Sequence, residues 1–273
     1  MSKINTKIAD LLLQMHGIDV SGFDETFLYK SVQKKITETH CKSEDEYYTL
    51  LEQNEKEAHH FLNSLRISYS EFFRNPLTYS VLERIVLPSI VSGKQNAKRK
   101  EIRIWSAACA SGQEPYSLAM LLEEMKNTDC NICNYRIFAT DQSELMLSEA
   151  RTGSYPADAL NNISMKRVKQ WFIKNGESYT VKPELKKNIE FSVFDLFNET
   201  LACPPSSIFG DFDLVIFANL LFYYKNEYRE KILKKTYSSL ARGGFLITGE
   251  TEREILIRKN YREVFPQSAI FHI

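Results

Sequence analysis

Acidic and amide side chains follow three apolar segments of this chain, where α/β proteins often hold a ligand. Glu114 comes after a run of small residues at 106–112, which itself follows an apolar segment that begins at Ile102. Asp141 and Asn219 end two later apolar segments. Because the carboxyl ends of parallel strands meet at one edge of a sheet, we expect these side chains to line one crevice.

The small-residue loop (residues 106–112) predicts the kind of ligand. Small residues let the backbone approach a ligand closely, and Pro115 marks a helix start whose N–H groups are unpaired. The loop has one glycine and lacks the G-x-G-x-x-G and G-K-[ST] patterns of phosphate sites. Glu114 adds a negative charge that a phosphate would avoid. The ligand is therefore neutral or cationic, and the sulfonium of S-adenosylmethionine fits better than NAD or ATP.

Two aspartates at strand ends are predicted to contact a nucleoside, and each has a structural alternative. Asp141 is expected to bind ribose hydroxyls; the alternative is that Asp141 or Ser143 caps the helix that follows. Asp195 is expected to meet the adenine amino group, with Leu196 packing on the ring, and the alternative is a turn residue.

Asn219 stands out because the segment before it is almost entirely apolar, and a buried amide must find hydrogen-bond partners. Its amide is expected to point into the shared crevice. Tyr223 lies four residues later and is predicted to face the same pocket, which would leave Tyr224 in the core.

The composition excludes several classes of protein. The chain has 273 residues, 35 basic and 35 acidic side chains and no net charge, which argues against a nucleic-acid binder with a basic surface. It has no apolar run long enough to span a membrane, and the N-terminus shows no cleavage pattern. We expect a cytoplasmic protein that binds no nucleic acid and does not insert into a membrane.

The cysteines predict neither disulfides nor a metal site. Their number is odd, at 5, and their spacing is scattered. The pair Cys130-x-x-Cys133 has no second pair and no flanking histidine, so reduced structural thiols are favoured over redox or zinc chemistry. No metal is expected.

The pattern of elements changes along the chain. Residues 1–66 show helical spacing and no strand pattern, and 67–75 form an ordered loop. From Glu101 strands and helices alternate, which implies a parallel sheet with helices on both faces. We predict an α/β protein, with an all-helical N-terminal domain and linker at 1–76. A doubly wound, mostly parallel, Rossmann-like domain follows at 77–273.

The predicted elements of the second domain are as follows. Strands are expected at 102–107, 135–140, 189–194, 212–217 and 244–249. Helices are expected at 77–90, 115–126, 143–151 and 226–241, the last closed by Arg242-Gly243-Gly244. An insert at about 151–190 holds a helix at 164–174 and a strand at 178–182 in a small antiparallel subdomain. Residues 262–265 and 269–273 form an added antiparallel pair.

Taken together, the motifs resemble the CheR type of chemotaxis-receptor glutamate methyltransferases over nearly the whole chain. They are S-x-S-E-F-F-R-N at 68–75, A-S-G-Q-E-P-Y-S at 110–117, A-T-D at 139–141, S-E-A-R-T-G-S-Y-P at 148–156 and F-D-L-V-I-F-A-N at 212–219. Their order and spacing match the family.

The resemblance implies a class I S-adenosylmethionine-dependent protein-glutamate O-methyltransferase. Its substrate would be a glutamate in the helical cytoplasmic region of a methyl-accepting chemoreceptor, with a methyl ester and S-adenosylhomocysteine as products. A monomer is expected. Arg74 and Tyr223 match positions near the transferred methyl and are the predicted catalytic residues. The implied cofactor contacts are Ser68, Ser70, Arg74, Ala108, Glu114, Asp141, Asp195, Leu196, Ala218 and Asn219.

The implied chemistry needs no general base, because a carboxylate is already ionised at neutral pH, with a reference pKa of about 4.3. Catalysis rests on alignment and on removal of water. Arg74 would hold the cofactor or the substrate carboxylate, and the alternative is a structural clamp between domains. Tyr223 would shape the surroundings of the methyl.

The chain departs from the family pattern where the protein substrate is expected. Ala218 stands where arginine is usual, Gln113 where glutamate is usual, and Glu250-Thr251-Glu252 where His-Ser-Glu is usual. The segment between Lys174 and Ile189 is short, which argues against capture of a receptor's C-terminal pentapeptide. Two alternatives therefore stay open, which are a regulatory or docking module that binds the cofactor and a methyltransferase for another protein carboxylate.

Overall fold

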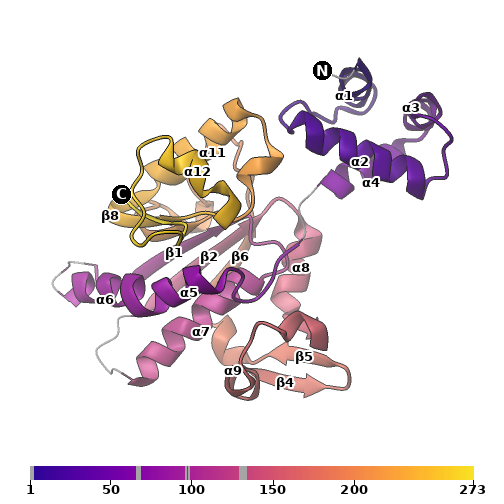
Figure 1. The fold of residues 1–273 in the computed structure, drawn as a ribbon. Helices are drawn as coiled ribbons and strands as arrows, with labels where there is room; N and C mark the ends of the chain where they lie inside the picture. Colours follow the sequence, from indigo (N-terminus) through magenta and orange to yellow (C-terminus); the bar gives the residue numbers. More distant parts are fainter. Residues whose placement is uncertain (1–2, 66–68, 96, 98, 129–133) are drawn as a thin grey trace. The chain divides into compact units, whose positions relative to one another are not determined.

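The computed structural model in Figure 1 describes residues 3–65, 69–95, 97, 99–128 and 134–273. Ser68, Cys130 and Cys133 lie outside the described residues. The chain divides into two units. Unit 1 comprises Met1–Ile67 and Leu221–Glu230, and unit 2 comprises Ser68–Leu220 and Lys231–Ile273.

Unit 1 is helical, which confirms the prediction for this part of the chain. Its N-terminal helices are α1 (Lys3–His16), α2 (Glu25–Glu38), α3 (Glu44–Gln53) and α4 (Glu55–Leu65). Asp24 caps α2 and Ser43 caps α3, each by accepting hydrogen bonds from backbone N–H groups of the first turn. The segment 221–230 joins them, because the Asp24 N–H donates to the Tyr223 carbonyl and Phe23 stacks on Tyr224.

Unit 2 holds the alternating elements. Its strands are β1 (Ile102–Ala107), β2 (Tyr135–Asp141), β3 (Ser154–Pro156), β4 (Phe172–Asn175), β5 (Ser178–Val181), β6 (Ile189–Val193), β7 (Phe212–Ile216), β8 (Leu240–Ile247) and β9 (Ile270–His272). Its longer helical segments are α5 (Pro76–Val81), the π-helix η1 (Leu82–Val86), α6 (Leu87–Gln95), α7 (Gln113–Thr128), α8 (Glu144–Thr152), α9 (Met165–Trp171), α10 (Pro183–Lys186) and α12 (Arg253–Ile257). Helix α11 (Asn226–Ser238) begins in unit 1 and ends in unit 2.

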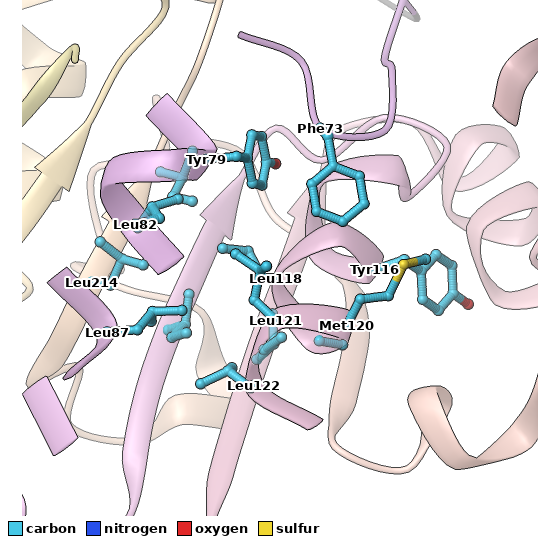
Figure 2. Packing of buried hydrophobic residues seen from close by; sticks show 14 of the residues in the cluster. Phe73, Tyr79, Leu82, Leu87, Tyr116, Leu118, Met120, Leu121, Leu122 and Leu214 are labelled. Carbon is cyan, nitrogen blue, oxygen red and sulfur yellow. The ribbon is translucent and has the colours of Figure 1, made fainter. Parts of the chain in front are cut away.

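The large sheet has the strand order β6-β2-β1-β7-β8-β9 and is parallel except for β9. Ile104 pairs with Ile137 on one side and with Leu214 on the other, so these side chains share one face. They belong to the core cluster that includes residues of α5, η1, α6 and α7. Figure 2 shows part of this packing. On the other face, the ring of Phe212 contacts those of Trp105 and Phe138.

The insert forms a separate small sheet, as predicted. Its antiparallel strand order is β3-β5-β4, and α9 leads directly into β4. Figure 1 shows this subdomain beside α7, away from β8 and the C-terminus. It comes between β2 and β6 in the chain, and these two strands remain neighbours in the large sheet.

The predicted helix end near Arg242-Gly243-Gly244 is wrong. Helix α11 ends at Ser238, and Leu240 already pairs with Phe212 in the sheet. A Cβ atom on Gly244 would lie 2.9 Å from the Ala241 carbonyl, so the glycine lets β8 bend rather than closing a helix.

Three other boundaries also differ from the sequence prediction. The helix expected at 164–174 ends at Trp171, because the next residues pair with β5. The helix expected at 77–90 extends through η1 and α6 to Gln95. The C-terminal pair is reduced to an isolated bridge between Glu263 and Phe271, since β9 pairs with β8. Among the described helices, none is long and apolar enough to cross a membrane.

The core of the large sheet is open to a direct test. Leu214 is fully buried. Leu214→Ala is expected to lower the free energy of unfolding of unit 2 by about 2–5 kcal/mol, because it leaves a cavity. Leu145→Ala is the control, because Leu145 is 68% exposed; its effect should stay within about 0.5 kcal/mol. Denaturant unfolding measures both, and equal effects would contradict the described packing.

Candidate functional site

The small-residue loop is held in an unusual backbone conformation after β1. Ala108, Ala110 and Gly112 have φ values of 68°, 46° and 92°, in a region that residues other than glycine seldom adopt. A Cβ atom on Gly112 would lie 2.8 Å from the Cβ of Ala150, so glycine is required there. The Cys109 N–H donates to the Thr140 carbonyl at 2.8 Å. The loop is thus fixed against the end of β2.

Asp141 is a second link between the small-residue loop and β2. One carboxylate oxygen accepts from the Ala110 N–H at 2.9 Å and the other from the Ser143 N–H at 2.8 Å. Ser143 caps α8, because its hydroxyl accepts from the Met146 N–H. The cap is therefore supplied by Ser143, and Asp141 is left nearly buried at the edge of the sheet. Its contact with ribose stays a prediction.

Glu114 lies in the first turn of α7 and is half-buried. The Ser106 hydroxyl donates to its Oε1 atom at 2.6 Å. Burial raises the pKa of Glu114 to about 7, and the Ser106 hydrogen bond and the positive charge of Arg74 oppose this rise. A carboxyl group in this state favours a cationic ligand group, which would keep it ionised.

Arg74 lies between two residues with left-handed backbone conformations, Phe73 at φ 49° and Asn75 at φ 62°. Such strain is stable only where the surroundings hold it. The Phe73 N–H donates to the Ser117 hydroxyl at 3.0 Å, and the neighbouring Phe72 is fully buried. The guanidinium carbon of Arg74 lies 5.2 Å from the ring centre of Tyr69. The backbone on the N-terminal side of Arg74 is therefore held by specific contacts, and the role of Arg74 in the site stays a prediction.

The insert contacts both the small-residue loop and the segment around Arg74. The sequence analysis did not predict these contacts. The Tyr155 hydroxyl of β3 donates to the Ser111 carbonyl at 2.6 Å. Arg167 of α9 lies 4.7 Å from the ring centre of Phe73, donates through Nε and Nη2 to Glu124, and also binds Glu83. The insert thus contacts the residue before Arg74 and the small-residue loop.

Asn219, predicted to end a strand, lies in a turn three residues after Ile216, the last residue of β7. Its backbone is also left-handed, at φ 60°. Its N–H donates to Oε2 of Glu252 at 2.9 Å. Its side-chain oxygen is buried and has no hydrogen-bond partner among the described residues. Ala218 beside it is partly buried and packs against the core cluster. Asn219 therefore offers an acceptor that a ligand could use.

Asp195, Leu196 and Tyr223 are three further predicted site residues. Asp195 is exposed and accepts from Gln142 Nε2 at 2.7 Å and from the Phe197 N–H at 2.8 Å, which is the geometry of a turn. Leu196 beside it is buried. Tyr223 belongs to unit 1, where its ring centre lies 4.8 Å from that of Phe27. Its role near the methyl stays a prediction.

Ser70 is half-buried, and Ser68 lies outside the described residues. Both serines stay predicted cofactor contacts. In the stretch that departs from the family pattern, Glu250 and Thr251 are exposed, whereas Glu252 has no exposed surface.

Comparison with known proteins decides the family. Residues 68–269 match the family described as CheR methyltransferase, SAM binding domain, and residues 6–65 match CheR methyltransferase, all-alpha domain. The chain belongs to the CheR methyltransferase family.

Three relatives show how far the likeness extends. A chemotaxis protein methyltransferase of Listeria innocua is 30% identical over 237 residues, which cover 87% of this chain and 85% of the relative. One of Borreliella burgdorferi is 28% identical over 265 residues, covering 96% and 91%. Chemotaxis protein methyltransferase 1 of Pseudomonas aeruginosa is 35% identical over 185 residues, covering 66% and 64%.

The residues of this CheR site fit S-adenosylmethionine. The half-buried carboxyl group of Glu114 suits a cationic group, and the buried oxygen of Asn219 suits a hydrogen-bond donor. Ala108 of the small-residue loop is partly exposed and has only a methyl side chain, which lets a ligand approach the backbone there closely. Asp141 lies at the same edge of the sheet, where it accepts a hydrogen bond from the Ala110 N–H.

The raised pKa of Glu114 predicts that binding depends on pH. S-Adenosylhomocysteine carries a cationic amino group, which binds best when Glu114 is ionised. As the pH falls below about 7, the affinity is expected to fall about tenfold per pH unit, because binding must first remove the proton from Glu114. Above about pH 8 the affinity should level off. Calorimetric titration across this range measures the effect.

Glu114→Gln is the matched control for this titration, because it removes the ionisable group and nearly keeps its shape. Any pH dependence that remains in the variant reports the ligand's own ionisation. The assignment fails if the wild-type protein and the variant show the same slope.

Tyr155→Phe tests the support that the insert gives to the small-residue loop. The change removes the hydroxyl that binds the Ser111 carbonyl and keeps the ring beside Phe72. The loss of about 0.5–1.5 kcal/mol for one hydrogen bond should weaken S-adenosylhomocysteine binding about three- to tenfold. Tyr179→Phe in β5 of the same sheet should leave affinity unchanged. Equal affinities for wild type and Tyr155→Phe would contradict the role.

Proposed function

We propose that this protein is a protein-glutamate O-methyltransferase that acts in the cytoplasm. It methylates glutamate side chains in the helical cytoplasmic region of a methyl-accepting chemoreceptor. The half-buried Glu114 beside the charge of Arg74 supports the proposal most strongly, because it suits a cationic cofactor and leaves an arginine for a carboxylate substrate. The relatives named chemotaxis protein methyltransferase support the biological setting.

S-Adenosylmethionine, when bound, supplies a methyl group on a sulfonium, which a substrate carboxylate oxygen accepts to give a methyl ester and S-adenosylhomocysteine. The substrate glutamate has a reference pKa of about 4.3, so it is ionised at neutral pH and needs no general base. The protein's residues therefore act by binding, alignment and exclusion of water.

Arg74 is the proposed residue for alignment of the substrate carboxylate. A guanidinium group can bind a carboxylate through parallel hydrogen bonds, which fixes direction as well as distance. The strained backbone at Phe73 and Asn75 limits how Arg74 can move. Glu114, Asp141 and the side-chain oxygen of Asn219 would hold the cofactor. Tyr223 is proposed to complete the surroundings of the methyl.

Ala218 supports a second candidate function. Family members usually have an arginine at this position, and here the alanine packs against the core cluster. The site would then bind the cofactor without turnover and act as a regulatory or docking module. Receptor-containing membranes incubated with methyl-labelled S-adenosylmethionine distinguish the candidates. Base-labile label supports the methyltransferase, whereas tight binding of S-adenosylhomocysteine without label on any receptor supports the module.

Arg74→Ala tests the catalytic assignment in the same assay. Loss of a group that aligns the reacting carboxylate is expected to lower methyl incorporation about 100-fold or more. The variant should also raise the pKa of Glu114, because the charge of Arg74 opposes its protonation. Arg84→Ala is the control, since Arg84 is exposed on η1. An Arg74→Ala variant that keeps both cofactor affinity and activity would refute the role.

A further inference from the structure

Glu252 joins the chain that follows β7 to the chain that follows β8. Its side chain has no exposed surface, which is rare for a glutamate. Its Oε2 atom accepts hydrogen bonds from the Asn219 N–H at 2.9 Å, the Gly249 N–H at 2.9 Å and the Thr248 hydroxyl at 2.7 Å. One carboxylate oxygen therefore receives donors from both strand ends.

The bond to Asn219 has a particular consequence for that residue. At φ 60° the backbone of Asn219 is in a conformation that asparagine tolerates but does not favour. A hydrogen bond from its N–H to a charged oxygen is stronger than one to a neutral carbonyl, so it opposes relaxation of this backbone.

Gly249 packs closely against Asn219. A Cβ atom at Gly249 would lie 2.7 Å from Nδ2 of Asn219 and 2.8 Å from its backbone nitrogen. Glycine therefore lets the two chain segments approach. The Oδ1 atom of Asn219 is buried and has no hydrogen-bond partner among the described residues. This oxygen is therefore available to accept a hydrogen bond from a ligand.

We propose that Glu252 is a positioning residue for methyl transfer, which holds the backbone of Asn219 so that its side-chain oxygen is presented to the cofactor. The inference rests on the proposed function, because it takes Asn219 to bind S-adenosylmethionine. Under this proposal Glu252 has a different role from its neighbours Glu250 and Thr251, which are exposed and available to the protein substrate.

The experiment is a double-mutant cycle on the full chain, with calorimetric binding of S-adenosylhomocysteine as the readout. Glu252→Gln keeps the shape and removes the charge. Asn219→Gly removes the amide side chain, and glycine adopts the same φ without strain. Thr248→Val is the matched control, because it removes a different donor to the same carboxylate oxygen.

Glu252→Gln is expected to weaken binding about tenfold, whereas Thr248→Val should weaken it less than about twofold, even if both lower the melting temperature. The double variant Asn219→Gly with Glu252→Gln should bind no more weakly than Asn219→Gly alone, because Glu252 acts through Asn219. Wild-type affinity in Glu252→Gln, or losses that multiply in the double variant, would overturn the proposal.

Hydrogen exchange at the Asn219 amide gives a second readout, which needs no ligand. In the wild-type protein it should exchange as slowly as the amides of β7, and in Glu252→Gln much faster. Fast exchange in the wild-type protein overturns the proposal. This wild-type measurement still tests the proposal in the event that Glu252→Gln does not fold. Absence of S-adenosylhomocysteine binding by the wild-type protein would instead count against the proposed function, and the exchange result would still test Glu252.

Discussion

The parallel register of β1 with its two neighbours is the constraint on which the site depends. Ser106 lies opposite Ala139 on β2 and Ile216 on β7, so the three strands end at nearly the same level. Side chains alternate between the faces of a strand, and a slip of one residue would exchange the core face for the other. Both faces are buried, and a slip would exchange the aliphatic packing around Ile104 for the aromatic packing around Trp105. This packing fixes the register, and the register brings the loops after these strands together at one edge.

The loops at that edge keep strained backbones because specific side chains hold them. Phe73, Ala110 and Asn219 all have positive φ. Each donates its N–H to a side-chain oxygen, namely that of Ser117, Asp141 and Glu252 respectively. The site is thus built by hydrogen bonds between backbone and side chains from distant elements. Such strain is kept where the surrounding structure fixes it, and it serves preorganisation of the site.

The sequence predicted the part of the fold that periodicity and strand ends encode. Strands β1, β2 and β7 and the strand-end acids follow from local pattern, and the family motifs added Arg74. The predicted helix at 226–241 is longer than α11, because a glycine pair resembles the sequence of a helix end. In the structure Leu240 pairs with Phe212 in the sheet, so the helix ends before it. The contact of Arg167 with Phe73 joins residues far apart in sequence, and no local pattern encodes it.

The three carboxyl groups of the site differ in how their oxygens are used, and this difference divides their roles. Asp141 and Glu252 accept backbone N–H groups and so tie loops together. Glu114 accepts a hydroxyl while burial raises its pKa to about 7. Backbone donors come with the fold, so the hydrogen bonds of Asp141 and Glu252 belong to the protein's own architecture. Among the described residues no backbone N–H donates to Glu114, and under the proposed function it is the carboxyl group that binds the cationic group of the cofactor.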